Sequence, residues 1–329
     1  MSSSEPGQGP GPTPQLSILI PTHSRRLLLD DLLTKLEEYD GPTLEVIVID
    51  DASSDGTSEM LTRHPNVRVL RNEVGRGFDA LPDAVRMARA ELIMQLDDDA
   101  WPAAGSLEKV VQHFEQRGPQ LGMVALPFVE PESGRRAYTP YLPKVAEGQA
   151  GHVPTRAFYQ GAVVFRRQAA LQVPPSPPGY FMYGTEPVTA IELLAAGWEA
   201  DFLPSAPIFH LWEARGQKVD VRSAVIMLRN DLATFRRYYR GWRRLDLMVG
   251  RYLTGLVHLL AAGAPWAFGR AMREADELLE LNPPHEVDEA ILTRMLPCFD
   301  GLGVTTFFGE TNRRRAAWFL GWLPADQAC

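Results

Sequence analysis

Residues 16–129 alternate short apolar runs with segments in which apolar residues recur at helical spacing. This alternation is typical of βαβ units, which build a largely parallel sheet covered by helices. We therefore expect an α/β fold. The apolar runs predict strands at residues 16–20, 44–49, 67–70, 92–96 and 123–129. Helical spacing predicts helices over residues 27–38, 78–90 and 103–117, with Pro82 in the first turn of the second.

Three consecutive aspartates, Asp97, Asp98 and Asp99, follow the apolar run at residues 92–96. Unpaired carboxylates are costly inside a sheet, so we expect them at its carboxyl edge, where α/β sheets bind ligands. There they can converge on a hard divalent cation that keeps positions free for substrate phosphates. The alternative is a solvated turn in which Asp99 caps the helix that follows.

Other expected strands also end in polar residues. Thr22 follows the first strand, Asp50 and Ser53 follow the second, and Arg76 follows the third. Glycines at positions 75 and 77 let the backbone approach a ligand closely, and the arginine between them can meet phosphate charge. Their order after successive strands points to a nucleotide site at this edge.

Composition narrows the class of protein. The 329-residue chain is 45% hydrophobic and 22% charged, which is typical of a globular protein. Its net charge of −8 argues against nucleic acid as the main partner. Cys298 and Cys329 form neither a metal-ligand spacing nor a disulfide framework, which suits a reducing cytoplasm. Residues 1–14 lack a signal-peptide pattern and predict a disordered tail. We expect a cytoplasmic protein. Association with the inner face of the membrane is an alternative that stays open.

The C-terminal part of the sequence is dominated by helical patterns. Residues 188–196 predict one helix, and residues 222–251 and the segment to about 296 predict more. The uncharged stretch 252–269 is as long as a minimal membrane span, but its proline and glycines favour a buried or interfacial helix pair. Residues 235–244 interleave arginines with aromatic residues. This pattern fits either a contact with anionic lipid or a helix packed on the rest of the protein. Whether the chain forms a homodimer is a question that the sequence leaves open.

Several motifs, in this order, resemble family 2 glycosyltransferases, which are inverting nucleotide-sugar enzymes with the glycosyltransferase A fold. They are SILIPT at 17–22, VIDDASSDGT at 48–57, LDDD at 96–99, QGAVVFRR at 160–167, FMYGTE at 181–186, AAGW at 195–198, LPSA at 203–206 and His210. The resemblance covers about residues 16–240. It implies a Rossmann-like nucleotide-binding mixed sheet flanked by helices. We accordingly expect a catalytic domain at 15–215 and a helical C-terminal extension at 216–329.

The resemblance implies a metal-dependent transfer of sugar, with inversion, from a nucleoside-diphosphate sugar to a hydroxyl acceptor. The acceptor would be a saccharide or a lipid-linked molecule, as in polysaccharide or glycolipid assembly. Mg²⁺ or Mn²⁺ would be held by Asp97, Asp99 and His210. The residues implied to contact the nucleotide are Pro21, Thr22, Arg25, Asp50, Ser53, Arg76, Asp97 and Asp98.

The sequence departs from the family pattern where the general base is expected. Glu186 is commonly followed by an aspartate in the family, but position 187 is proline here. Three interpretations stay open: Glu186 is itself the base, Glu213 or Asp220 substitutes, or the protein binds a nucleotide sugar with little or no transfer. A second departure is Leu81-Pro82, where many relatives carry Arg-Asn.

Aromatic residues gather in the second half of the expected catalytic domain, where sugars can stack on their rings. Of these we expect Trp212 and Tyr183 to contact the acceptor. Two other enzyme classes fit less well. A nucleotidyltransferase is disfavoured by the GTE and GW segments at 184–186 and 197–198, and a dinucleotide oxidoreductase by the absence of G-x-G-x-x-G after the first strand.

Overall fold

The computed structural model describes residues 13–136, 142–143, 151–211 and 220–299. Most of the predicted N-terminal tail and the predicted boundary between residues 215 and 216 lie outside these ranges, as do Trp212 and Glu213.

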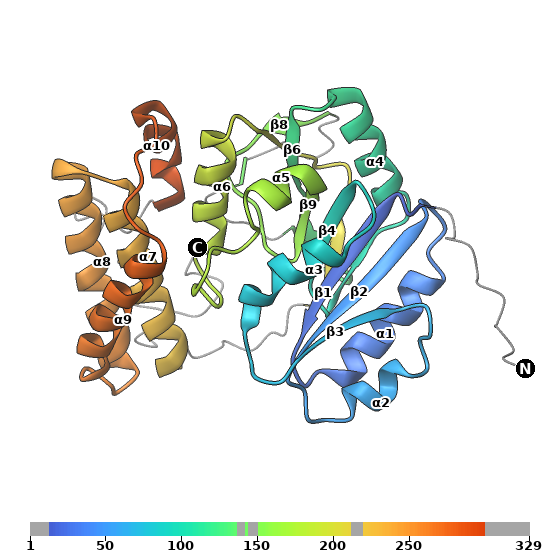
Figure 1. Ribbon diagram of the computed structural model, residues 1–329, viewed down its shortest axis with the longest axis horizontal. Helices are drawn as coiled ribbons and strands as arrows, with labels where there is room; N and C mark the ends of the chain where they lie inside the picture. Colours follow the sequence, from blue (N-terminus) through green and yellow to red (C-terminus); the bar gives the residue numbers. More distant parts are fainter. Residues whose placement is uncertain (1–12, 137–141, 144–150, 212–219, 300–329) are drawn as a thin grey trace, which may run out of the picture.

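A mixed eight-stranded sheet forms the centre of the molecule, in the order β3-β2-β1-β4-β9-β6-β10-β8 (Figure 1). Strands β3, β2, β1 and β4 run parallel, and β9 is inserted antiparallel between β4 and β6. The strands are β1 (Leu16–Thr22), β2 (Leu44–Asp51), β3 (Arg68–Asn72), β4 (Leu92–Leu96), β6 (Leu121–Ala125), β8 (Val153–Pro154), β9 (Ala162–Arg166) and β10 (Glu199–Phe202). The prediction of a mixed sheet flanked by helices is confirmed.

A second, three-stranded sheet has the order β5-β11-β7. Its strands are β5 (Ala100–Pro102), β7 (Phe128–Val129) and β11 (Ile208–His210). Because β5 follows the aspartate triplet directly and pairs antiparallel with β11, it places His210 opposite Ala100. This small sheet therefore brings a distant histidine to the end of β4.

Helices cover both faces of the large sheet. One core lies between the sheet and the helices α1 (Arg26–Glu37), α2 (Thr57–Leu61) and α4 (Ser106–Arg117). The other core lies under the 3-10 helix η1 (Gly77–Ala80) and the helices α3 (Leu81–Met87), α5 (Arg167–Gln172), α6 (Thr185–Ala195) and α7 (Val221–Tyr238). Alternate strand residues supply the two cores: Ile18 and Ile20 belong to the first, and Leu19 belongs to the second.

The predicted strands and helices are found with shifted ends. The predicted helix 78–90 divides into η1 and α3, and Pro82 lies in the first turn of α3 as expected. The predicted strand 123–129 divides into β6 and β7, which join different sheets. Proline at 127 lacks a backbone N–H, so a single continuous ladder through this point would lose a bond.

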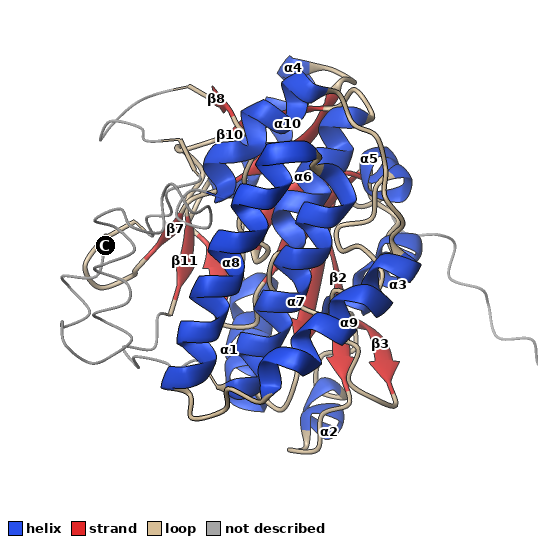
Figure 2. Ribbon diagram, turned by 90° about the vertical axis from the view of Figure 1, so that its left-hand side faces the viewer, coloured by secondary structure: helices blue, strands red, loops and turns tan. Residues whose placement is uncertain are grey.

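The C-terminal helices are α7, α8 (Gly241–Ala261), α9 (Ala267–Leu281) and α10 (Glu289–Met295), followed by the 3-10 helix η2 (Leu296–Phe299). Figure 2 shows α6 to α9 in front of the strands. The predicted helix 222–251 divides in two because Tyr239 and Arg240 are extended. The uncharged stretch 252–269 forms the end of α8 and the start of α9, which agrees with the predicted helix pair. Among the described residues, no helix is both long and apolar enough to cross a membrane.

The arginine-aromatic segment 235–244 is largely packed against the protein. Phe235, Tyr238 and Tyr239 are buried. Arg236 pairs with Asp276, Arg237 with Glu192, and Arg243 with Glu289. These contacts favour the packed-helix interpretation. Trp242 is 73% exposed, and contact with a membrane or a second copy stays a prediction.

Glu45 provides a test of what stabilises the sheet. Its buried carboxylate accepts hydrogen bonds from Ser17 Oγ (2.6 Å), Arg68 Nη1 (2.6 Å), Arg89 Nε (2.7 Å) and the Arg89 backbone N–H (2.8 Å). Burial opposes its charge, but these bonds outweigh burial and lower the pKa of Glu45 to about 2. A depressed pKa stabilises the fold above the unfolded-state value and loses this contribution as pH falls towards the folded-state value.

We therefore expect Glu45→Gln to lower the free energy of unfolding at pH 7 by about 3 kcal/mol, measured by urea denaturation. The difference between Glu45→Gln and the unsubstituted protein should shrink as pH falls from about 4.5 towards 2. Glu38→Gln, at an exposed position, should change stability by less than about 0.5 kcal/mol. A difference that stays constant with pH would refute this role for Glu45.

Candidate active site

The ends of β1 and β4 meet through Asp98. Its carboxylate accepts hydrogen bonds from Thr22 Oγ1 at 2.7 Å and from Arg25 Nη1 at 2.5 Å. Arg25 also donates to Asp99 Oδ2 at 2.5 Å, so one guanidinium holds two of the three aspartates. Pro21 and Thr22 lie opposite Ile49 and Asp50 in the parallel register of β1 and β2. Five of the predicted nucleotide contacts (Pro21, Thr22, Arg25, Asp50 and Asp98) therefore lie along one stretch of the sheet edge.

Asp97, Asp99 and His210 form a second group at the same edge. One ligand atom from each residue lies within 4.8 Å of the other two. His210 Nε2 is 3.2 Å from Asp99 Oδ1, and its ring lies 4.5 Å from the ring of Phe128, centroid to centroid. The helix cap proposed as the alternative role of Asp99 is not formed, since the residue before α4 is Gly105.

The pKa values of the three aspartates are not shifted in the same direction. Burial and the neighbouring charge of Asp99 raise the pKa of Asp97 well above its usual range. Burial likewise raises the pKa of Asp98 to about 6, against the pull of Arg25. Burial also opposes the charge of Asp99, but bonds from His210 and Arg25 keep its pKa below the usual range.

These residues fit a divalent cation. Two half-buried carboxylates concentrate negative charge, and burial together with the charge of Asp99 raises the pKa of Asp97. Two carboxylate oxygens and one imidazole are a donor set suited to Mn²⁺ or Mg²⁺, with positions left for phosphate oxygens.

Gly161, just before β9, sets the position of Asp97. A Cβ added at Gly161 would lie 2.1 Å from both Cγ and Oδ2 of Asp97, which no real structure tolerates. Only glycine leaves room for the carboxylate at this point.

Gly161→Ala should therefore displace Asp97 and lower the activity of the candidate site by about 100-fold in a steady-state assay. Gly269→Ala is a matched control, because that glycine lies in α9 with no atom within 4 Å of an added Cβ. The control should retain full activity and gain slightly in stability. Equal activity of the two variants would contradict the role given to Gly161.

Asp50 is held by several donors at the end of β2. It accepts from the Ser53 N–H at 3.0 Å, Ser58 Oγ at 3.2 Å and Arg71 Nη1 at 2.7 Å. Ser53 Oγ in turn accepts from the Ser24 N–H at 2.9 Å, which ties the ends of β1 and β2. No sequence motif indicates Arg71, because its contact with Asp50 depends on the register between β2 and β3.

The glycine-flanked Arg76 is organised by Asp51. Asp51 accepts from the N–H groups of Arg76 (2.8 Å) and Gly77 (2.9 Å), which fixes the loop after β3. The Arg76 guanidinium itself bonds Asp83 at 2.7 Å and the Asp79 carbonyl at 2.9 Å. The loop thus adjoins the predicted nucleotide site through Asp51, while the charge of Arg76 is directed to α3.

Glu186 lies in the first turn of α6. Burial is the main cause that raises the pKa of its carboxyl, and the charge of Asp231 adds to the effect. Thr185 Oγ1 accepts from Gln160 Nε2 at 3.0 Å and donates to Glu186 at 3.3 Å. Gln160 directly precedes Gly161, the glycine that lies against Asp97. A short chain of contacts therefore links the cluster of Asp97, Asp99 and His210, called the metal-type cluster below, to Glu186.

The segment before α6 is strained and held by α7. Phe181 and Tyr183 have φ values of +64° and +60°, which non-glycine residues rarely adopt. The buried Asn230 amide on α7 donates to the carbonyls of Tyr180 (3.0 Å), Met182 (2.9 Å) and Tyr183 (2.7 Å). The first C-terminal helix therefore fixes the segment that carries Tyr183, whose side chain is 40% exposed. Tyr183 stays the predicted acceptor contact.

Asp220 is one of the two alternative bases predicted from the sequence. Asp220 caps α7, where its Oδ1 accepts from the Ser223 N–H at 2.7 Å. This bond engages one oxygen of the carboxylate that was an alternative base. Glu213, the other alternative, and Trp212, the second predicted acceptor contact, lie outside the described residues.

Residues 17–173 match the family described as glycosyl transferase family 2. Among curated proteins, a GalNAc(5)-diNAcBac-PP-undecaprenol beta-1,3-glucosyltransferase of Campylobacter jejuni is 28% identical over 105 residues, 30% of this chain and 34% of that protein. The chain spans 34–38% of the length of the first three curated relatives.

Two solved structures share the fold. One is the mannosyltransferase PcManGT of Pyrobaculum calidifontis in complex with GDP-Man and Mn²⁺ (TM-score 0.55, 22% identity, covering 94% of this chain and 87% of that one). The other is residues 1–349 of S. aureus TarS in complex with UDP-GlcNAc (TM-score 0.58, 13% identity, 94% and 88% covered). At these identities the likeness establishes the glycosyltransferase A fold.

Proposed function

We propose, from the match of residues 17–173 to glycosyl transferase family 2, that the chain transfers one sugar from a nucleoside-diphosphate sugar to a hydroxyl acceptor, with inversion. The observation that carries the proposal is the gathering of Asp97, Asp99 and His210 at the sheet edge that also holds Thr22, Arg25 and Asp98. Neighbours of the same fold bind GDP-Man with Mn²⁺ and UDP-GlcNAc, which supports a nucleotide-sugar donor and a divalent cation.

Residues at different places along the sheet edge have different roles in this proposal. Asp97, Asp99 and His210 would hold Mg²⁺ or Mn²⁺, which when bound neutralises charge on the departing diphosphate. Thr22, Arg25 and Asp98 form a preorganised hydrogen-bonded wall beside this site, and Asp50 and Ser53 extend it towards the base of the nucleotide. Such fixed groups need little rearrangement when charge develops.

Glu186 is the general base in this proposal. Its carboxylate takes the proton of the acceptor hydroxyl as the acceptor oxygen bonds the anomeric carbon from the side opposite the diphosphate. The bond from that carbon to the diphosphate oxygen breaks, and the nucleoside diphosphate leaves. The raised pKa of Glu186 increases its strength as a base. A saccharide or lipid-linked acceptor is proposed by analogy with the Campylobacter relative, whose name includes a PP-undecaprenol-linked saccharide.

The proposal is tested by adding a panel of UDP-, GDP- and dTDP-sugars to the protein, with and without Mn²⁺. One nucleotide class with Mn²⁺ should raise the unfolding temperature by about 5 °C at a hundredfold excess over its Kd. The same donor should be turned over to nucleoside diphosphate when acceptor saccharides are supplied. Failure of every nucleotide sugar to bind with Mn²⁺ would refute the proposal.

A further inference from the structure

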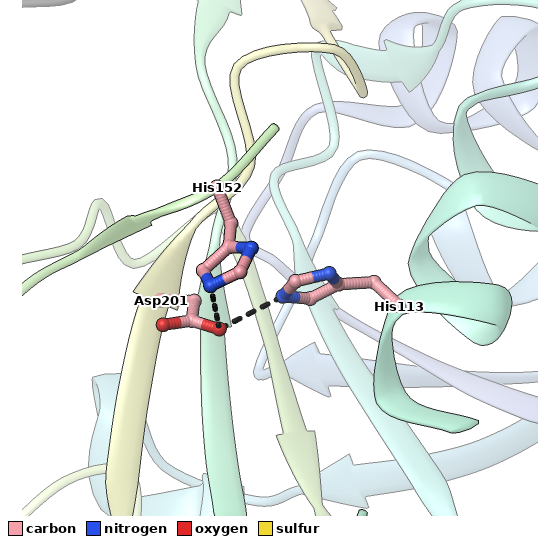
Figure 3. Close-up of side chains that lie close together, drawn as sticks. All are labelled: His113, His152 and Asp201. Carbon is pink, nitrogen blue, oxygen red and sulfur yellow. Dashed lines mark hydrogen bonds and ion pairs between the residues drawn. The ribbon is translucent and has the colours of Figure 1, made fainter. Parts of the chain in front are cut away.

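A second group of possible metal ligands lies at the edge of the large sheet formed by β10 and β8. His113 is on α4, His152 directly precedes β8, and Asp201 is in β10 (Figure 3). In the strand order, β9 and β6 separate β10 and β8 from β4, at whose end Asp97 and Asp99 lie. The function proposed above uses none of these three residues.

The three side chains converge on one oxygen. His113 Nε2 is 2.9 Å and His152 Nε2 is 3.8 Å from Asp201 Oδ2, and Figure 3 shows both rings directed towards it. The three ligand atoms all lie within 4.8 Å of one another. Tetrahedral Zn²⁺ with ligands at its usual distances keeps their atoms about 3.3 Å apart. The distances from Asp201 Oδ2 to the two histidine nitrogens, 2.9 and 3.8 Å, lie on either side of this value. Side-chain shifts of under about 1 Å would therefore bring these atoms to tetrahedral spacing.

The surroundings of Asp201 hold its carboxylate in place. The residue is 1% exposed, and its carboxylate is bonded to His113 and Arg117. Arg117 Nε donates to the same Oδ2 at 2.8 Å, and Arg117 Nη2 pairs with Glu199 at 2.8 Å. Hydrogen-bonded partners of this kind orient a metal-binding carboxylate without being ligands themselves. Because His152 is exposed, solvent can supply a fourth ligand.

We propose that His113, His152 and Asp201 form a Zn²⁺ site separate from the candidate active site. Two imidazoles and one carboxylate suit zinc, whereas the two carboxylates and one imidazole of the active-site cluster suit Mn²⁺ or Mg²⁺. The ion would join α4 and the segment before β8 to β10. Its role would be to stabilise this edge of the sheet, where β8 contributes only two residues.

The test is thermal unfolding of chelator-treated full-length protein titrated with Zn²⁺ alone. Saturating Zn²⁺ should raise the unfolding temperature by about 5 °C. His152→Gln is the most informative variant, because the exposed His152 lies 3.8 Å from Asp201 and its loss should hardly affect the metal-free protein. This variant should lose most of the zinc-dependent shift. His64→Gln is the matched control: His64 is buried and bonded to Asp30 and Glu37 elsewhere, and its loss should leave the shift intact.

Two results would overturn the inference. The absence of any zinc-dependent shift would mean that the cluster is only a hydrogen-bonded network around Asp201. An undiminished shift in His152→Gln would place the ion elsewhere, and its loss in His210→Gln would then assign it to the active-site cluster. Neither result bears on nucleotide-sugar binding with Mn²⁺, so this inference and the proposed function can fail separately.

Discussion

Replacing Asp99 by asparagine should lower the rate of sugar transfer by about 10³-fold and remove its dependence on Mn²⁺. Asp99 supplies one of two carboxylates in the cluster with His210, and it is the one that stays ionised next to Arg25. A metal that stabilises a leaving diphosphate contributes several kcal/mol to the transition state, which corresponds to this loss.

Asp98→Asn is the informative comparison for Asp99→Asn. Asp98 bonds Thr22 and Arg25 and does not belong to the metal-type cluster. Its loss should raise KM for the donor while the rate keeps its Mn²⁺ dependence. Steady-state kinetics over a range of Mn²⁺ concentrations separates the two effects. Identical behaviour of the two variants would mean that the three aspartates do not divide the work as described.

Glu186→Gln should lower kcat by about 10²- to 10⁴-fold with little change in the affinity for the donor. Glutamine is nearly the same size but cannot accept a proton. The pH dependence provides a second readout. A base must be deprotonated to act, so kcat of the unsubstituted protein should fall as pH drops through the raised pKa of Glu186. The remaining activity of Glu186→Gln should lack this decline.

Pro187→Asp is the control that separates the interpretations of the missing aspartate. If Glu186 is the base, an aspartate at 187 should change the rate only a few-fold. A large gain in transfer would show instead that the natural chain lacks an effective base. Near-normal activity of Glu186→Gln would contradict the assignment of Glu186 directly.

Strong periodic patterns in the sequence predicted most of the large sheet and its helices. The run at 92–96 followed by three aspartates could be placed correctly, because a buried strand and an acidic end leave one location for the carboxylates. The small sheet could not be predicted in the same way. Strand β5 has three residues, which is too short for a period, and it forms only because β11 lies beside it.

Residues of the candidate site that belong to a recognisable motif could be predicted from the sequence. Residues that are placed by a single long-range contact could not. Asp97, Asp98 and Asp99 stand in a recognisable run. Asn230 has no local signal, since its three hydrogen bonds go to carbonyls 47 to 50 positions earlier in the chain. The contact of Gly161 with Asp97 likewise depends on β9 entering the sheet next to β4.

The most direct test of the central claim is a crystal of the protein soaked with Mn²⁺ and its nucleotide-sugar donor, measured at the manganese absorption edge. The account predicts an anomalous peak within ligand distance of Asp97, Asp99 and His210, with the donor diphosphate beside it. A bound donor whose diphosphate lies away from these residues, or a manganese peak at any other site alone, would contradict it.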